Sequence, residues 1–202
     1  MVLYPRCAQV PRPFTIAKGP PRAKGYGTVT PDLFEILAVR ELRKVGFDLG
    51  QVRVHRRSEL AEPESGFVLE LVVSLRQPGA TWARRALVVC RKQLRAVERD
   101  VIESVKTRLA DAHAEAALVF VTTDFSAGAI AAAEENGIAL LRVVDGRSAY
   151  NTGDHYPAWL PGHLAQLVDR DAAGQPRARL LEAGLLETIV AHVERPISNE
   201  RK

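Results

Sequence analysis

Apolar residues recur at helical spacing after Thr30. They lie three or four residues apart: Leu33, Phe34, Leu37, Ala38 and Leu42. Thr30, Pro31 and Asp32 supply a hydroxyl N-cap, a proline at the first helical position and an acid in the first turn, and each of these favours the start of a helix. Gly46 can adopt the left-handed conformation that ends one. We predict a helix over residues 31–45 with one face on a core.

Three segments with strand character follow this helix. Residues 51–57 alternate, with Val52 and Val54 on one side and basic side chains on the other, which is typical of a half-buried strand. Residues 67–75 are almost wholly apolar, and residues 84–91 contain a continuous apolar run. Because the links between the three segments are short, we predict an antiparallel meander.

The pattern then alternates between helices and buried strands. Apolar residues return to helical spacing from Val97 to Leu109, and residues 117–121 form a short apolar strand. Ser126 is placed to cap an alanine-rich helix that Gly137 would end, and residues 138–144 form a further strand. This order predicts an α/β domain whose last strands are joined by crossover helices.

The chain changes character after residue 146. Glycine, proline and asparagine occur in quick succession, which indicates a loop, and an amphipathic helix follows. The apolar stripe of that helix consists of Leu180, Leu181, Leu185, Leu186, Ile189, Val190 and Val193. The stripe either folds back on its own domain or forms a homodimer contact. We divide the chain into an arm (1–27), an α/β domain (28–148) and a loop with a C-terminal helix (149–202).

Positive charge is concentrated in the arm. The chain has 28 Lys and Arg residues against 24 Asp and Glu residues, a net charge of +4. Five of the cations and no acid lie in the first 27 residues, which leaves the rest of the chain at a net charge of −1. The five are Arg6, Arg12, Lys18, Arg22 and Lys24. The arm is also rich in proline and glycine, and such a segment cannot bury enough apolar surface to fold alone.

Composition excludes several classes of protein. Hydrophobic residues make up 47% of the 202 positions and charged residues 26%, which is enough apolar surface for a folded core. No apolar run reaches the roughly 18 residues of a membrane span. The N-terminus lacks the apolar run of a signal peptide, so we expect a cytoplasmic protein with no membrane contact. Cys7 and Cys90 lack disulfide or zinc-site spacing, and the five histidines lack metal-site spacing.

Two motifs carry a resemblance to a known family. The first is Pro31-Asp32-Leu33-Phe34-Glu35, with Val45-Gly46-Phe47 at the far end of the same helix. The second is the run from Ala117 to Ser126, followed by Ala129, Ala133 and Asn136-Gly137-Ile138. Together they resemble the Mrr-type branch of the restriction-endonuclease-like fold, the PD-(D/E)XK nuclease superfamily. The resemblance implies an αβββαβ core with a mixed sheet flanked by helices, here with a C-terminal helical extension.

The same resemblance implies a metal-dependent chemistry. Members of the superfamily place an aspartate on the second strand, a glutamate or glutamine on the third, and a lysine two residues later. The two oxygen ligands hold Mg²⁺, and the lysine stabilises the attacking hydroxide or the phosphate. Residues two apart on a strand share a face, so both groups of an E-x-K motif point at one phosphate.

This chain departs from that motif. The positions in register on the third strand hold Val89, Cys90 and Arg91, and a shift by one residue gives Cys90, Arg91 and Lys92, which still has no carboxylate. The second strand has one acid, Glu70. The candidate catalytic residues are Glu70, Arg91, Lys92 and the helix glutamate Glu35, and the candidate metal ligand is Glu70. A single carboxylate is a poor magnesium site, so we predict a degenerate one.

Two of these acids also have structural interpretations. An unpaired charge inside an apolar strand is costly, so Glu70 is either a vestigial ligand or half of an ion pair with Arg91 or Lys92. Glu35 either approaches the site, as in some family members, or is a solvated helix residue.

A second basic region lies between Arg76 and Arg108, with nine cations against three acids. The candidate nucleic-acid contacts are Arg76, Arg84, Arg85, Arg91, Lys92, Arg95 and Arg99, with Arg22 and Lys24 from the arm. Arginine guanidinium matches the geometry of phosphate. The alternative is a solvated surface that is merely rich in arginine.

Three functions are compatible with these observations. The leading hypothesis is a nuclease-like domain that binds DNA non-specifically through phosphate contacts and is catalytically degenerate. The second is an Mrr-type endonuclease with an unconventional active site, and only in that case would Mg²⁺ be a cofactor. The third is a protein-interaction or structural module in which the C-terminal helix mediates assembly.

Overall fold

The computed structural model describes residues 29–60, 66–146, 149 and 162–194. The first half of the fold consists of α1 (Pro31–Val45), β1 (Asp48–Glu59), β2 (Phe67–Arg76), β3 (Ala83–Lys92) and α2 (Arg99–Asp111). It continues with β4 (Ala116–Val121), α3 (Ala127–Glu135), β5 (Ile138–Asp145), β6 (His163–Arg170), β7 (Pro176–Leu180), the 3₁₀ helix η2 (Ala183–Leu185) and α5 (Leu186–Val193).

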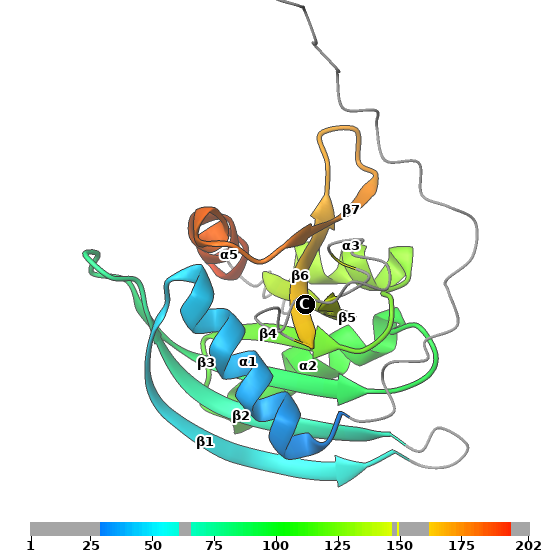
Figure 1. Ribbon diagram of the computed structural model, residues 1–202, viewed down its shortest axis with the longest axis horizontal. Helices are drawn as coiled ribbons and strands as arrows, with labels where there is room; N and C mark the ends of the chain where they lie inside the picture. The colour runs from blue at the N-terminus through cyan, green and yellow to red at the C-terminus, as the bar shows by residue number, and fades with distance from the viewer. Residues whose placement is uncertain (1–28, 61–65, 147–148, 150–161, 195–202) are drawn as a thin grey trace, which may run out of the picture.

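The seven strands form one sheet in the order β1 to β7. The first three are an antiparallel meander, β3 to β5 are parallel, and β6 and β7 return to antiparallel pairing. Helices α1 and α5 lie on one face of this sheet, and α2 and α3 lie on the other (Figure 1). The expected αβββαβ core with a mixed sheet flanked by helices is confirmed.

Local chemistry sets the helix ends as the sequence predicts. The Thr30 hydroxyl accepts a hydrogen bond from the Leu33 amide at 3.3 Å, and Ser126 caps α3 in the same way through the Ala129 amide at 3.2 Å. Gly46 ends α1 with a φ of 116°, a left-handed conformation that favours glycine. These caps satisfy amide and carbonyl groups that a helix end leaves unpaired.

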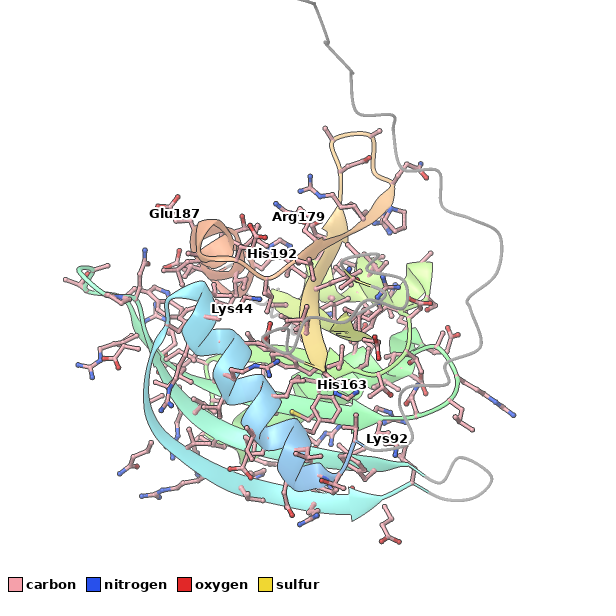
Figure 2. All side chains as sticks on the ribbon, in the orientation of Figure 1. Lys44, Lys92, His163, Arg179, Glu187 and His192 are labelled. Atoms are coloured by element: carbon pink, nitrogen blue, oxygen red, sulfur yellow. The ribbon has the colours of Figure 1, made fainter. Side chains whose placement is uncertain are left out.

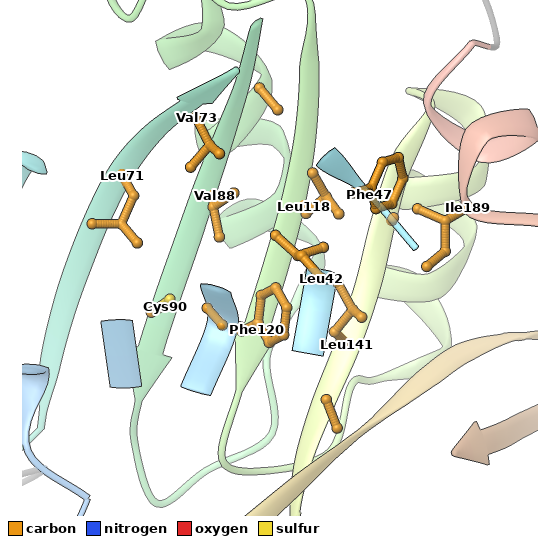
Figure 3. Close-up of a cluster of buried hydrophobic side chains, with 14 of the residues drawn as sticks. Leu42, Phe47, Leu71, Val73, Val88, Cys90, Leu118, Phe120, Leu141 and Ile189 are labelled. Atoms are coloured by element: carbon orange, nitrogen blue, oxygen red, sulfur yellow. The ribbon is translucent and has the colours of Figure 1, made fainter. Parts of the chain in front are cut away.

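Both faces of the central strands are buried. On one face, Leu42 of α1 packs with Leu71, Val88 and Phe120 of the sheet (Figure 3). On the other face, Ile102 and Val105 of α2 are buried with alternate residues of β2, β3 and β4. The continuous apolar runs of β2 and β3 follow from this double coverage, because a strand with helices on both faces has no solvent side.

Strand β1 differs from the expected simple alternation. A register shift between Val54 and Arg56 places Arg57 on the same face as Val54, where its guanidinium lies 3.4 Å from the Asp32 carboxylate of α1. β1 is an edge strand, and the Val54 side chain is 55% exposed although it points to the α1 side of the sheet. A bulge in an edge strand reorients every following side chain.

The described part of the predicted C-terminal loop contains two strands. β6 pairs with β5, and β7 pairs with β6 through a turn in which the Asp171 carboxylate accepts from the Ala173 and Gln175 amides. β5 would otherwise present unpaired backbone groups at a sheet edge, which explains why this short, weakly patterned segment is extended. The predicted helix correspondingly begins at Leu186 rather than near Leu180.

Helix α5 folds back on its own chain. Ile189, Val190 and Val193 are buried in the same core as α1. The apolar stripe of this helix is therefore covered within the chain. A homodimer through α5 stays a prediction, and such a dimer would have to use the outer face of the helix.

A buried carboxylate links α1 to the C-terminal strands. The Glu41 side chain is fully buried, and its Oε2 accepts from the Ala165 amide of β6 at 3.2 Å. Arg40 donates to Glu41 at 3.0 Å and also to the carbonyl of His163, which is labelled in Figure 2 at the start of β6. No helix within the described ranges is long and apolar enough to cross a membrane.

Candidate functional site

Three of the candidate catalytic residues, Glu70, Arg91 and Lys92, lie on two opposite faces of β2 and β3, and the fourth, Glu35, lies on α1. Glu70 pairs with Val89 across the two strands, and the neighbouring row pairs Leu69 with Cys90. Val89 belongs to the core under α2, whereas Leu69 and Cys90 belong to the core under α1. Since side chains alternate along a strand, Arg91 shares the face of Glu70 and Lys92 shares the face of Cys90. The two registers considered for the E-x-K motif therefore correspond to the two faces of the sheet.

Glu70 is held by an arginine that the sequence did not single out. The Glu70 side chain is 1% exposed, and its Oε1 accepts a hydrogen bond from the Arg108 guanidinium of α2. Arg108 is itself fixed by the carbonyl and the hydroxyl of Ser104, at 3.1 and 2.9 Å. The prediction that Arg91 or Lys92 pairs with Glu70 was wrong. Glu70 lies on the face of the sheet that α2 covers, and the Arg108 side chain of that helix reaches it.

The surroundings of Glu70 are cationic. Arg56 of β1 lies directly opposite Glu70 in the strand register. Burial, and then the nearby charge of Arg56, lower the pKa of Arg108 below its ordinary value. Glu70 Oε2 is buried and has no hydrogen-bond partner among the described residues. A carboxylate that pairs with Arg108, with Arg56 on the neighbouring strand and an aliphatic Val89 opposite, does not fit a divalent cation, because the cation would be repelled and would lack its second oxygen ligand.

The other two candidate catalytic residues are Lys92, on the face of the sheet that α1 covers, and Glu35, on α1 itself. Lys92 lies near the start of α1, where its ammonium donates to the Val29 carbonyl at 3.2 Å (Figure 2). Burial, and then the charge of Glu35, raise the pKa of the fully buried Cys90 thiol, so this cysteine is not a nucleophile. On this face of the sheet, the cross-strand pair next to Lys92 consists of Leu69 and Cys90. Within the described ranges, no group of three or more His, Cys, Asp or Glu side chains is placed to hold a metal ion.

A polar network at the carboxyl ends of β3 and β4 escaped the sequence analysis. The buried Gln93 accepts from Arg91 Nε through its Oε1 and donates to the Arg95 carbonyl at 2.6 Å through its Nε2. The backbone amide of Gln93 lies 3.4 Å from the Thr122 hydroxyl, and the Thr123 hydroxyl donates to the Arg95 carbonyl at 2.9 Å. The network positions Arg91 and the segment that carries Arg95.

Arg142 extends this polar end of the sheet onto β5. Its guanidinium contacts the Asp124 carboxylate and donates to Gln166 Oε1 at 2.7 Å. An arginine in the interior of the largely apolar β5 was the available sequence signal, since a charge at a partly buried strand position requires a partner.

The structure separates the candidate nucleic-acid contacts into two groups. Arg76, Arg84 and Arg85 lie where β2 ends and β3 begins, and Arg91, Lys92 and Arg95 lie at the far end of β3. Arg91 follows Arg85 by six positions along β3, a distance of about 20 Å. Arg99 begins α2 and pairs with Glu135 of α3 at 2.7 Å. Arg22 and Lys24 lie outside the described residues.

The order of helices and strands, with site positions on the second and third strands, defines a restriction-endonuclease-like domain. Residues 27–146 match the family model Mrr_cat, described as a restriction endonuclease. The chain therefore belongs to the Mrr-type restriction endonuclease family. A search of curated proteins and a search of solved structures each gave no match.

Proposed function

We propose that this chain is a nuclease-like domain that binds DNA non-specifically through its phosphates and whose catalytic metal site is degenerate. The observation that carries the proposal is the state of Glu70. Its carboxylate pairs with Arg108 and faces Val89 where a second oxygen ligand would be needed. On the opposite face, the strand positions beside Lys92 hold Leu69 and Cys90, which supply no oxygen ligand at all.

The arginines at the carboxyl ends of the central strands support the DNA-binding part of the proposal. In open α/β sheets, ligands bind outside the carboxyl ends of the strands. Here Arg91 is oriented by Gln93, and Arg95 is exposed in the segment that the same glutamine holds. An arginine held in one orientation loses little conformational freedom when it binds a phosphate. Phosphate contacts carry no base information, so the binding is expected to be non-specific.

A metal-dependent endonuclease remains the second candidate, and one observation favours it. Glu35 is close enough to Cys90 to act on its pKa, and Lys92 follows on the same face of β3. A carboxylate and a lysine are two of the groups that the family chemistry uses. This function requires at least one further oxygen ligand beside Glu35.

Binding is tested with a labelled duplex, by fluorescence anisotropy at several salt concentrations. We expect affinity to fall with salt and to be similar for unrelated sequences. Arg91→Ala should weaken binding and make the slope of log K against log salt less negative by about 0.9, the value for one phosphate contact. The matched control is Arg43→Ala, which removes an exposed arginine from the last turn of α1. It should change neither the affinity nor the salt slope. Absence of duplex binding would refute the proposal and favour the interaction module.

Catalysis is tested by nicking of supercoiled plasmid in Mg²⁺ and in Mn²⁺. We expect no cleavage above that of a Glu35→Ala/Lys92→Ala double variant. Cleavage by the unaltered protein that is lost in Lys92→Ala would refute the degenerate site and establish an enzyme that uses the α1 face. Cleavage that is instead lost in Glu70→Gln, with the fold intact, would place an active metal site on the α2 face.

A further inference from the structure

A shallow cavity of about 400 Å³ lies at the end of β2 and the start of β3, away from Arg91. Its lining includes Gly50, Ser74, Arg76, Arg84 and Arg85. We propose that this pocket binds one phosphodiester group of a nucleic-acid backbone. The identity of that ligand as DNA rests on the proposed function, whereas the pocket and its charge do not.

The floor of the pocket depends on a close approach of two strands. The register of β1 shifts between Leu49 and Val52, and Gly50 lies in this irregular stretch beside Ser74 of β2. A Cβ atom built on Gly50 would lie 3.1 Å from the Ser74 Cβ, which is tighter than nine in ten real Cβ contacts. The φ of Gly50 is not positive, so it is space rather than backbone conformation that favours glycine here. The absence of a side chain at Gly50 therefore allows β1 and β2 to approach closely at the floor of the pocket.

Two of the lining arginines are held in place, and they lie on opposite faces of the sheet. Arg76 shares the face of Ser74, and its guanidinium pairs with Asp48 at 3.0 Å. Arg84 points to the α1 face, where its guanidinium pairs with Glu115 at 3.3 Å and lies over the ring of Trp82, 6.0 Å from its centroid. The contact with Asp48 reduces the freedom that Arg76 would lose on binding a ligand.

Arg85 supplies the free cation of the pocket. It is the direct cross-strand neighbour of Ser74, so its side chain and the hydroxyl lie on one face of the sheet. Within the described ranges, neither the Arg85 guanidinium nor the Ser74 hydroxyl has a hydrogen-bond or ion-pair partner. A guanidinium fork beside a hydroxyl donor matches the oxygens of a phosphate group.

The charge of the pocket selects the kind of phosphate. On the face of Ser74, the guanidinium groups of Arg76 and Arg85 and the carboxylate of Asp48 leave one net positive charge. A backbone phosphodiester carries one negative charge, whereas a terminal or inorganic phosphate carries nearly two at neutral pH. A phosphodiester neutralises the pocket, whereas the second charge of a dianion would lose its water without gaining a partner, and this cost favours the phosphodiester. The remaining volume of the pocket accommodates part of an attached sugar.

The test is an NMR titration of the full-length ¹⁵N-labelled protein at constant ionic strength. The probes are dimethyl phosphate, as a phosphodiester, and inorganic phosphate. We expect saturable shifts of the Gly50, Ser74 and Arg85 amides, with dimethyl phosphate the tighter ligand. Arg85→Gln should weaken dimethyl phosphate binding about tenfold or more, as for the loss of a charged hydrogen bond. Arg43→Gln, which changes an exposed arginine in the last turn of α1, is the matched control and should leave the affinity unchanged.

Three results would overturn the inference. They are the absence of saturable shifts at these amides, an unchanged affinity in Arg85→Gln, and tighter binding of inorganic phosphate than of dimethyl phosphate. Gly50→Ala provides a second variant, because the added methyl group intrudes on the floor without removing a charge, and it should also weaken binding.

Duplex binding separates this inference from the proposed function. With labelled duplex, Arg85→Gln should make the salt slope less negative by about 0.9. If the protein binds duplex but the pocket does not titrate, the pocket inference is refuted and the proposed function stands. If the pocket titrates but no duplex binds, the DNA function is refuted and the phosphodiester site stands.

Discussion

Removal of Arg108 should destabilise the protein far more than removal of an ordinary surface arginine. Arg108→Met deletes the guanidinium that pairs with Glu70 and keeps most of the apolar stem. The Glu70 carboxylate is 1% exposed and then remains among apolar side chains. Neither of its oxygens has a hydrogen-bond partner on α2 any longer. Breaking a buried pair by removal of one partner leaves an uncompensated buried charge.

The structure sets the expected magnitude. Loss of one partner of a buried ion pair costs about 3–5 kcal/mol. Arg56 lies opposite Glu70 on β1 and can partly neutralise the stranded carboxylate, so we expect the lower end of that range, about 3 kcal/mol. Replacement of both partners, in Glu70→Leu/Arg108→Met, should recover most of that loss, because an apolar pair of similar volume needs no compensation.

Urea denaturation at pH 7, followed by circular dichroism, measures these differences. The four proteins of the double-mutant cycle give a coupling energy between Glu70 and Arg108, which we expect to be about 2 kcal/mol or more. Arg99→Met is the matched control, since Arg99 pairs with Glu135 at 2.7 Å on the surface and such pairs contribute about 0–1 kcal/mol.

Two results would refute this reasoning. One is an Arg108→Met variant that loses no more stability than Arg99→Met. The other is stabilisation of Arg108→Met by Mg²⁺. If Glu70 still belonged to a site that binds Mg²⁺, the ion would stabilise this variant by about 2.7 kcal/mol at a concentration one hundred times the dissociation constant. We expect no change in the urea midpoint in millimolar Mg²⁺.

Three further predictions follow from other parts of the chain. Deletion of residues 1–27 should weaken duplex binding and make the salt slope less negative by up to about 4–5, if all five cations contact phosphates; an unchanged slope would make the arm a tether. Ile189→Ala, at a fully buried position of α5, should cost about 2–5 kcal/mol in thermal denaturation, and the partly buried Leu186→Ala should cost less. Burial raises the pKa of Asp169, but hydrogen bonds from Arg177 and Arg179 outweigh it and leave that pKa below the ordinary 3.8. The carboxylate therefore contributes stability that is present above pH 3.8 and is lost as the pH falls through the lowered pKa. The stability difference between the parent and Asp169→Asn in urea should be large at pH 6 and shrink as the pH falls below 3.8, and a pH-independent difference would contradict this assignment.

The parts of the fold that local chemistry determines were predictable. The Thr30 and Ser126 caps act within three residues along the chain, and the apolar runs of β2 and β3 report their own burial. Strands β6 and β7 were missed because their extended form depends on pairing with the edge of β5, which no pattern within residues 163–180 encodes. The bulge of β1 was missed for a related reason, since it appears only against the register of β2.

The candidate site was predicted in its residue types but not in its geometry. Sequence spacing identified Glu70 as an unusual buried acid, and the structure buries it. The partner Arg108 lies 38 residues away on another element, so a helix crossing rather than spacing brings the two together. Spacing also could not tell which register of the third strand faces α1, because both registers place cations near the end of that strand.

The contact between Glu41 and the Ala165 amide has a consequence for how such a protein can be inherited and recombined. The family match ends at residue 146, yet a fully buried acid of α1 takes its backbone donor from β6, beyond that limit. An exchange of sequence at residue 146 would give the new chain either an acid without its donor or a strand without its anchor. Glu41 and the β6 segment are thus expected to be gained and lost together among descendants of this chain, although one lies inside the matched region and the other outside it.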